Sequence, residues 1–291
     1  MIKKVLLFWN PGAGGVTSRK VDQVIDRLEM SGFDVRSVHT ERRRPIDGLC
    51  QTYIDHLPGH DAVLIAGGDG TISNVLNGLG DYLNIPFGIV PLGTVNLLSR
   101  ELGVTFATFD QALRDGQIRQ MHLGNINQLR FTMTASVGFD ARSVERLNVD
   151  LKRRIGVPAY IVALLRTIGL CRNDLFQVTC DGQTQSAKSV IVMNGQYYGG
   201  SYRLGYNTGV SKPGFQIYLL GRNDFWSILR YCLGLLRGRL HDCADVKVLE
   251  AREVLIDTAD KASPVQSDGD VYLRLPVEIR SNTHSYEVLL P

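Results

Sequence analysis

The segment Ala62–Thr71, AVLIAGGDGT, constrains the fold of this chain more than any other. Its first five residues form a continuous apolar run that is typical of a buried strand, and a glycine-rich loop with one carboxylate follows. Gly67, Gly68 and Gly70 can adopt positive φ and have no Cβ, so their backbone N–H groups can approach the phosphate oxygens of a ligand. Asp69 is expected at the carboxyl end of the strand, where open α/β sheets bind their ligands.

The residues around this loop predict a repeat of strands and helices. Strands are predicted at 5–9, 33–39, 62–66 and 87–90, and helices at 17–30, 45–57 and 72–79. Thr71 is predicted to be the N-cap of the last of these helices, whose positive end would then face the same ligand. Because such a repeat favours parallel strands joined by right-handed crossovers, the amino-terminal half is predicted to be a Rossmann-like layered domain.

The pattern changes near residue 122. Short strands dominate the rest of the chain, many of them separated by D-G, N-G or P-G dipeptides, and two helical segments interrupt them at 149–170 and 226–236. A chain of 291 residues usually forms two domains. We therefore predict an α/β fold, with a nucleotide-binding domain over 1–122 and a β-rich sandwich domain over 123–291. A ligand cleft is expected between them, and a return of the last strand to the first domain is left open.

Composition narrows the functional classes. The net charge of +3 gives no reason to expect a nucleic-acid partner. Five scattered cysteines without a C-x-x-C pair are typical of a reduced, cytoplasmic protein, and the histidines lack the spacing of a zinc site. The first apolar run is too short for a signal peptide or a membrane span, so at most a transient contact with the inner face of the membrane is expected. A homodimer is left open.

Three glycine-rich loops are expected at one edge of the predicted sheet. The loops at 10–15, 67–71 and 91–96 each follow a predicted parallel strand, and Thr40 ends the second strand at the same edge. The first loop lacks the G-x-G-x-x-G pattern of dinucleotide-binding folds, and no Gly-Lys-Ser or Gly-Lys-Thr of a Walker A loop occurs. The sequence therefore predicts that backbone amides and short polar side chains hold the phosphates of a nucleotide.

Five motifs carry a resemblance to a known family. They are Asn10–Gly15, Gly67–Thr71, Pro91–Asn96, Val137–Ala141 and Asp268–Asp270. In this order and spacing the chain resembles the diacylglycerol-kinase catalytic-domain superfamily, which includes bacterial lipid kinases, sphingosine kinases and ceramide kinase. The resemblance implies a nucleotide domain related to those of NAD kinase and phosphofructokinase, followed by a β-rich lipid-binding domain. It also implies phosphorylation of a lipid hydroxyl with ATP and Mg²⁺.

The resemblance also implies roles for individual residues. The expected nucleotide contacts are Asn10, Gly14, Thr40, Gly67, Gly68, Asp69, Gly70, Thr71, Ile72, Ser73, Gly93, Thr94 and Asn96. Asp140 matches the position that contacts the lipid head group in sphingosine kinases. Asp270 stands where the family motif usually has the Glu that serves as general base. Asp69 and Asp270 are thus the two candidate catalytic carboxylates.

Two positions depart from the family pattern. Asp270 is shorter than Glu by one methylene, about 1.5 Å, and a displacement of that size can slow a reaction about a hundredfold unless the backbone compensates. At Ser211–Gly214, many bacterial members have an Asp-Gly whose aspartate helps to bind a structural magnesium, whereas this chain has Pro213. We predict that this second magnesium site is missing and that the magnesium bound with the nucleotide is retained.

Several alternatives stay open. Arg153 and Arg154 are either surface residues or phosphate contacts, and the apolar segments 159–165 and 225–236 either pack in a core or contact lipid. A kinase for a soluble nucleotide such as NAD is one alternative to a lipid kinase. A catalytically impaired regulator that binds nucleotide or lipid is the other. Diacylglycerol, a sphingoid base, monoacylglycerol and phosphatidylglycerol all remain candidate acceptors.

Overall fold

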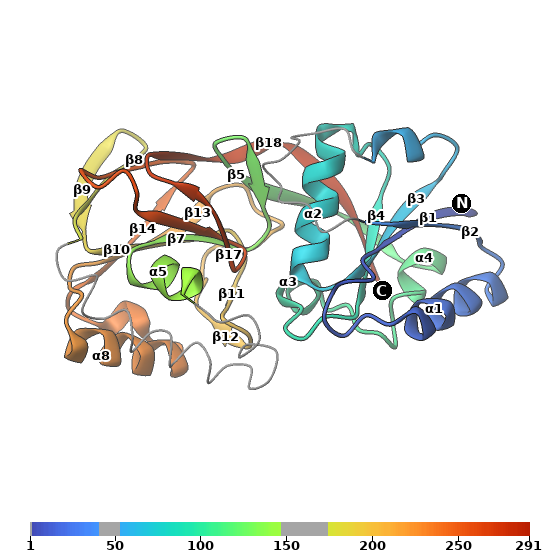
Figure 1. Cartoon of the computed structure of the whole chain (residues 1–291), viewed down its shortest axis with the longest axis horizontal. Coiled ribbons are helices and arrows are strands. Elements are labelled where there is room, and N and C mark those ends of the chain that lie inside the picture. The colour runs from blue at the N-terminus through green and yellow to red at the C-terminus, as the bar shows by residue number, and fades with distance from the viewer. Residues whose placement is uncertain (1, 41–52, 147–173) are drawn as a thin grey trace. The chain divides into compact units, whose positions relative to one another are not determined.

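The structure is a computed structural model that describes residues 2–40, 53–146 and 174–291. It comprises two compact units (Figure 1). The first contains Met1–His122 together with Thr283–Pro291, and the second contains Leu123–Asn282. The chain passes from one unit to the other within β5 (Gln117–Ile126) and again within β18 (Val277–Leu290). The carboxyl-terminal part of the last strand therefore belongs to the first unit.

Some predicted features lie outside the described residues. They are most of the helix predicted at 45–57, nearly all of the helix predicted at 149–170, the basic pair at 153–154 and the apolar segment 159–165. Of the first helix, the structure describes a 3₁₀ turn at Ile54–His56.

The first unit contains a parallel sheet with the strand order β2-β1-β3-β4-β18. Its elements are β1 (Lys4–Trp9), α1 (Ser18–Met30), β2 (Asp34–His39), β3 (Ala62–Gly67), α2 (Asp69–Leu79), β4 (Phe87–Pro91), α3 (Leu97–Leu102) and α4 (Gln111–Arg114). Every neighbouring pair in this order is parallel. The predicted Rossmann-like alternation of strands and helices is confirmed.

Burial explains why these segments form strands and helices. β1 is buried from Val5 to Trp9 and β3 over its full length, as expected for central parallel strands that are covered on both faces. Val21, Val24 and Leu28 form the buried stripe of α1 at helical spacing. The Thr17 hydroxyl accepts a hydrogen bond from the backbone N–H of Lys20 at 3.3 Å and caps this helix, as the predicted helix start requires.

The predicted N-cap of α2 is wrong. The helix begins at Asp69 with Gly68 as its N-cap, and the Thr71 N–H donates to the Gly68 carbonyl at 2.9 Å. Thr71 is buried and packs against the end of β3, where a Cβ added to Gly67 would lie 2.6 Å from the Thr71 hydroxyl oxygen. The Thr71 side chain is thus committed to packing inside the first turn, and the helix starts three residues before the predicted position 72.

The second unit consists mainly of antiparallel strands. Its elements are β6 (Leu129–Phe131), β7 (Thr134–Val137), α5 (Phe139–Glu145), β8 (Phe176–Cys180), β9 (Gln183–Ala187), β10 (Ser189–Met193), β11 (Tyr197–Tyr198), β12 (Tyr202–Arg203), β13 (Phe215–Leu220), α8 (Phe225–Leu236), β14 (Val246–Ala251), β15 (Glu253–Asp257), β16 (Pro264–Ser267) and β17 (Asp270–Arg274). One sheet has the order β14-β13-β10-β7-β16-β17, and β15, β8 and β9 continue from β18 in the other. The predicted β-rich sandwich is confirmed, whereas the short helix α5 was not predicted.

The six-stranded sheet of the second unit is covered on both faces. β10 is buried along its whole length, and its side chains alternate between the two faces. On one face Ile191 and Met193 share a core cluster with residues of α5 and α8, which lie on the same side of the sheet in Figure 1. The rings of Phe131 and Phe215, from the two sheets, stack with centroids 5.8 Å apart. Helix α8 is therefore fixed to the sandwich by its inner face.

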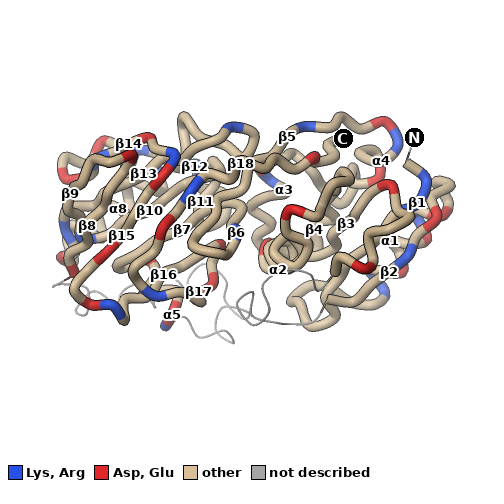
Figure 2. The backbone as a smooth tube through the Cα atoms, turned by 90° about the horizontal axis from the view of Figure 1, so that it is seen from above, with Lys and Arg blue, Asp and Glu red and all other residues tan. Residues whose placement is uncertain are grey.

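Charged residues of both signs are interspersed along each unit (Figure 2). Within the described part of the chain, no helix combines the length and the apolar character needed to cross a bilayer.

Candidate functional site

The order of the parallel strands defines a ligand-binding position in the first unit. β1 and β3 are neighbours, and the chain continues outward from β1 to β2 but in the opposite direction from β3 to β4. In open α/β sheets, ligands bind at such a switch point, outside the carboxyl ends of the strands. Here these ends continue into the loop at 10–15 and into Gly68. The predicted glycine-rich loops therefore lie at the position where this fold binds its ligands.

The three loops contact one another at this edge. The Leu92 N–H donates to the Gly67 carbonyl at 3.0 Å. A Cβ added to Gly93 would lie 2.4 Å from the Cα of Gly68, and a Cβ added to Gly15 would lie 2.7 Å from the Leu92 carbonyl oxygen. Such distances are too short for any side chain, so close approach of the loops requires these glycines. The predicted convergence of the three loops is confirmed.

The reason for the glycines in Gly67–Gly70 differs in part from the expected one. None of Gly67, Gly68 and Gly70 has a positive φ. Gly67 is required because Thr71 packs against it, and Gly68 because a Cβ there would lie 3.1 Å from the Cα of Gly93. The absence of a Cβ, rather than positive φ, is therefore what these two positions use.

Asp69 joins the second loop to the third. Its carboxylate accepts hydrogen bonds from the backbone N–H groups of Leu97 and Leu98, at 3.0 and 3.1 Å, and so caps α3. Asn96, which precedes α3, has φ 52° and makes no capping hydrogen bond with its side chain. Removal from solvent raises the pKa of Asp69, and the hydrogen bonds from the backbone oppose that shift. Since both carboxylate oxygens are engaged, the geometry favours a positioning role for Asp69.

The first loop leaves room beside the sheet edge. The Asn10 side-chain oxygen accepts a hydrogen bond from the Gly12 N–H at 2.8 Å and closes the turn that begins the loop. A Cβ added to Gly14 would meet no atom of the described residues within 4 Å. Gly14 therefore faces open space, which is compatible with its predicted nucleotide contact.

Two polar side chains at this edge have unused hydrogen-bonding capacity. Thr40 is buried, and its N–H donates to the Trp9 carbonyl at 2.8 Å. Its hydroxyl has no hydrogen-bond partner among the described residues, and neither has the side-chain oxygen of Asn96, whose amide nitrogen donates to the Gly93 carbonyl at 2.8 Å. Because buried polar atoms normally have partners, these two oxygens fit a polar ligand such as a nucleotide.

The remaining predicted nucleotide contacts differ in their exposure. Gly70 and Thr94 are exposed, and Ser73 is half-buried. The Ile72 side chain lies fully in the core, so only its backbone is available to a ligand. Helix α2 has no side-chain cap, which leaves the positive end of its dipole for an anion.

Asp140 lies in the second unit, in the first turn of α5. The Ser136 hydroxyl donates a short hydrogen bond to its carboxylate. Removal from solvent raises the pKa of Asp140, and hydrogen bonds from Ser136 and Tyr198 oppose the shift. The preceding Gly138 has φ 90°, and a Cβ there would lie 2.3 Å from the Ser189 hydroxyl oxygen. The motif Val137–Ala141 thus places one shielded carboxylate at a rigid turn from β7 into α5.

The first two residues of the motif Asp268–Asp270 form the two-residue turn of a β-hairpin. Asp268 and Gly269 have φ 48° and 87°, as a type I′ turn requires, and β16 and β17 pair on either side. The Asp268 carboxylate accepts hydrogen bonds from the backbone N–H groups of Thr132, Met133 and Thr134, at 2.6, 2.8 and 3.1 Å. Removal from solvent raises its pKa to about 6, although the hydrogen bonds oppose that shift. The motif alone did not predict this structural role of Asp268.

Asp270 differs from the other motif carboxylates. It is the first residue of β17 and is exposed, and within the part of the chain that the structure describes its carboxylate has no hydrogen-bond or ion-pair partner. Asp268 fixes the turn just before it. Asp270 is therefore the motif carboxylate that no other described group engages.

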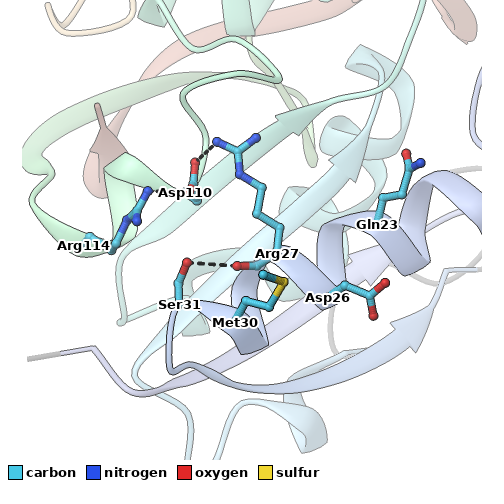
Figure 3. Close-up of a pocket in the computed structure, with 7 residues that line it drawn as sticks. All are labelled: Gln23, Asp26, Arg27, Met30, Ser31, Asp110 and Arg114. Carbon is cyan, nitrogen blue, oxygen red and sulfur yellow. Dashed lines mark hydrogen bonds and ion pairs between the residues drawn. The ribbon is translucent and has the colours of Figure 1, made fainter.

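A surface hollow elsewhere in the first unit has a structural explanation (Figure 3). Buried Asp110 lies between Arg27 and Arg114, and Arg27 also donates to the carbonyls of Phe106 and Ala107. The hollow adjoins the carboxyl end of α1, just before β2 begins, and so lies at the edge opposite the glycine-rich loops. The ion pairs tie α1 to the segment around α4. Three or more His, Cys, Asp or Glu side chains do not gather into a metal-binding cluster anywhere in residues 2–40, 53–146 and 174–291.

Two protein-family models match the chain. Residues 4–126 match the diacylglycerol kinase catalytic domain, and residues 133–290 match the YegS C-terminal NAD kinase beta sandwich-like domain. Together they span almost the whole chain. All the predicted nucleotide-binding residues lie in the first match, and Asp140 and Asp270 lie in the second.

Similar proteins carry names that agree with these matches. A diacylglycerol kinase from Mycobacterium tuberculosis is 27% identical, with 100% of this chain and 96% of that protein aligned. A diacylglycerol kinase from Bacillus subtilis is 24% identical, with 100% and 97% aligned. The crystal structure of a diacylglycerol kinase from Bacillus anthracis matches with a TM-score of 0.75 at 24% identity, over 100% of this chain and 98% of that one. The structural match shows a common fold.

The close contact of Gly93 with Gly68 generates a first prediction. Gly93→Ala should destabilise the protein by about 1–3 kcal/mol, because its Cβ would force the two loops apart. Gly14→Ala is the matched control and should change the free energy of unfolding by less than about 1 kcal/mol, because its Cβ enters open space. Urea denaturation measures both values. Equal destabilisation by the two variants would contradict the proposed packing.

A second prediction follows from Asp268. Its pKa in the folded protein, about 6, is above its ordinary value of 3.8, so protonation favours the folded state. This stabilisation, about 3 kcal/mol, is complete below pH 3.8 and is lost as the pH rises through 6. The free energy of unfolding of the wild type, minus that of Asp268→Asn, should therefore fall between about pH 4 and pH 7. Denaturant titrations at several pH values measure this difference, and a flat or rising difference would contradict the assignment.

Proposed function

The chain belongs to the diacylglycerol kinase catalytic-domain superfamily, and from this premise we propose that it transfers the γ-phosphoryl group of MgATP to a hydroxyl of a diacylglycerol- or sphingoid-type lipid. The observation that carries the proposal is the junction of three glycine-rich loops at the switch point of the parallel sheet. A kinase of this superfamily uses a nucleotide, and the first unit offers it backbone amides and two polar oxygens that have no partner among the described residues.

In the proposed mechanism the first unit holds the nucleotide. The amides of the glycine-rich loops and the amino end of α2 bind phosphate oxygens, and the Thr40 hydroxyl and the Asn96 side-chain oxygen complete the polar contacts. Asp69 keeps the third loop in place through α3. Magnesium bound with the nucleotide would supply positive charge that stabilises the transferred phosphoryl group. Rigid loops favour transfer because phosphoryl transfer depends mainly on positioning and electrostatic stabilisation.

Asp270 accepts the proton of the acceptor alcohol. Its carboxylate is exposed and unpaired within the described part of the chain, and Asp268 fixes the turn that precedes it. Asp140 contacts the polar head group of the lipid, and Ser136 holds its carboxylate in position. A general base of this kind contributes about 10²–10⁴-fold to the rate.

The acceptor class is inferred from the relatives. Relatives aligned over nearly their whole length are named diacylglycerol kinases, which favours a lipid acceptor and contact of the protein with a membrane surface. A soluble nucleotide such as NAD is the second candidate acceptor, favoured by the NAD kinase-like description of the second domain. The two candidate acceptors would give different phosphorylated products, a phosphorylated lipid or a phosphorylated NAD.

The proposed function predicts a specific response to changes at Asp270. Asp270→Asn should lower kcat about a hundredfold or more while leaving the affinity for ATP unchanged, because the amide cannot accept the proton. Asp270→Glu, which restores the residue usual in the family, should keep kcat within about tenfold of the wild type or above it. Transfer of label from γ-labelled ATP with Mg²⁺ to a panel of lipids in mixed micelles, and to NAD, measures kcat for each acceptor.

Three outcomes would contradict this function. Absence of labelled lipid across the panel would exclude a lipid kinase, and a labelled NAD product would replace it with the second candidate. Equal labelling by the Asn variant would exclude Asp270 as the base. ATP binding without any labelled product would favour a regulator that lacks turnover.

A further inference from the structure

Helix α8 has an apolar inner face and an apolar outer face. On the inner face, Ser227, Ile228 and Tyr231 are buried, and the last two belong to the core cluster of the second unit. The Asp224 carboxylate caps the helix by accepting a hydrogen bond from the Ser227 N–H at 3.1 Å. The outer face carries large apolar side chains in contact with solvent, namely Phe225, Trp226, Leu229, Leu233 and Leu236. Core packing accounts for the inner face alone.

The five outer side chains form one stripe. At about 100° per residue they fall within an arc of about 100° on the helix surface. Trp226 is 73% exposed and Leu236 is 54% exposed, at opposite ends of the helix. The stripe therefore extends over the full length of α8, from its first residue to its last.

Other exposed apolar side chains of the described chain do not gather in this way. Each lies on a different element or loop: Met30, Tyr82, Val95, Phe106, Ile118, Leu175, Tyr206 and Leu255. Single exposed apolar residues are ordinary on protein surfaces, whereas a contiguous apolar stripe marks an interaction site.

Positive charge lies next to the stripe. From Phe225 to Leu240 the sequence has three arginines and no acidic residue. Arg237 and Arg230 lie about 20–40° beyond the edge of the apolar arc. Arg237 is exposed, and no hydrogen bond or ion pair joins its side chain to another described residue. Arg230 is half exposed although it is paired with Asp245 at 2.6 Å.

We propose that α8 is an in-plane membrane anchor whose outer face enters the boundary between head groups and acyl chains of a bilayer rich in anionic lipids. An amphipathic helix with Trp, Phe and Leu on one face and arginines beside them has the chemistry of such anchors. Arg237, beside the stripe, offers its guanidinium group to lipid phosphates, whereas Arg230 stays paired with Asp245. The inference rests on the proposed function, since a lipid acceptor is held in a membrane.

The anchor lies near the residue proposed to contact the lipid head group. Phe139, which directly precedes Asp140, belongs to the same core cluster as Ile228 and Tyr231 of α8. Cys232 of α8 lies close enough to Asp140 for that carboxylate to raise the pKa of its thiol, in addition to the larger effect of burial. Docking of α8 therefore places Asp140 close to the membrane surface.

Vesicle sedimentation without nucleotide tests the anchor. The full-length protein should sediment with vesicles of phosphatidylcholine and phosphatidylglycerol, and at least about tenfold less with phosphatidylcholine alone. The double substitution Leu229→Gln and Leu233→Gln should weaken binding to the anionic vesicles at least about tenfold. Leu255→Gln is the matched control, because Leu255 is 46% exposed on β15 of the same unit, close to the 42% of Leu229 and of Leu233. It should change binding by less than about twofold.

The two tryptophans provide a second measurement. Trp9 is 7% exposed and Trp226 is 73% exposed, so anionic vesicles should shift the wild-type emission to shorter wavelength through Trp226 alone. Trp226→Phe should remove this shift. Arg237→Gln should weaken binding chiefly at low salt, because it removes a contact with lipid phosphate.

The outcomes separate the anchor from its alternatives and from the kinase activity. Lack of binding by the wild type, or equal weakening by Leu255→Gln, would overturn the anchor even if the protein phosphorylates lipids in micelles. A dimer in solution that the Leu229→Gln/Leu233→Gln variant converts to a monomer, with no effect on vesicle binding, would assign the stripe to a subunit interface. Vesicle binding that depends on Leu229 and Leu233 in a protein without lipid product would support the anchor while contradicting the proposed function.

Discussion

The approach of Gly93 to Gly68 is the contact on which the site in the first unit depends. Neighbouring parallel strands bring their following loops to one edge, but only residues without a Cβ allow these two loops to touch. Asp69 secures the contact, because its carboxylate caps α3 immediately after the third loop. Gly15 extends the same packing to the first loop. The surface offered to a nucleotide is thus made of backbone groups whose positions are set by contacts within the protein.

The second unit uses a carboxylate in the same way. Asp268 accepts hydrogen bonds from three successive backbone N–H groups at the start of β7, as Asp69 accepts two at the start of α3. In both units an acidic residue of a conspicuous motif holds a neighbouring segment and has little capacity left for a substrate. Asp270, two residues after Asp268, is exposed and unengaged in the described structure. Of the four motif carboxylates, Asp69 and Asp268 therefore position the backbone, Asp140 is held by Ser136, and only Asp270 has no such contact among the described residues.

Features that depend on local sequence pattern could be predicted, whereas features that depend on contacts between distant residues could not. Strands such as Ala62–Gly67 are continuous apolar runs, so their positions and the convergence of their loops followed from local pattern and topology. The start of α2 could not be predicted in this way, because Thr71 has the chemistry of an N-cap. Only its packing against Gly67 shows that it lies inside the helix. The role of Asp268 depends on a partner segment 134–136 residues away along the chain, which no local pattern specifies. Helix α5 is too short for a helical period to be recognised.

The surroundings of helix α8 also could not be predicted from its sequence. Its sequence is apolar around most of the helix, so core packing and lipid contact were both left open, and in the structure only one face packs on the core cluster. Burial of Ile228 and Tyr231 fixes the helix to the core, whereas the outer side chains remain 42–73% exposed. In water the outer side chains expose apolar surface at a cost in free energy. A bilayer removes that cost at the place where a lipid acceptor is found, so selection for docking explains an apolar face that selection for stability does not.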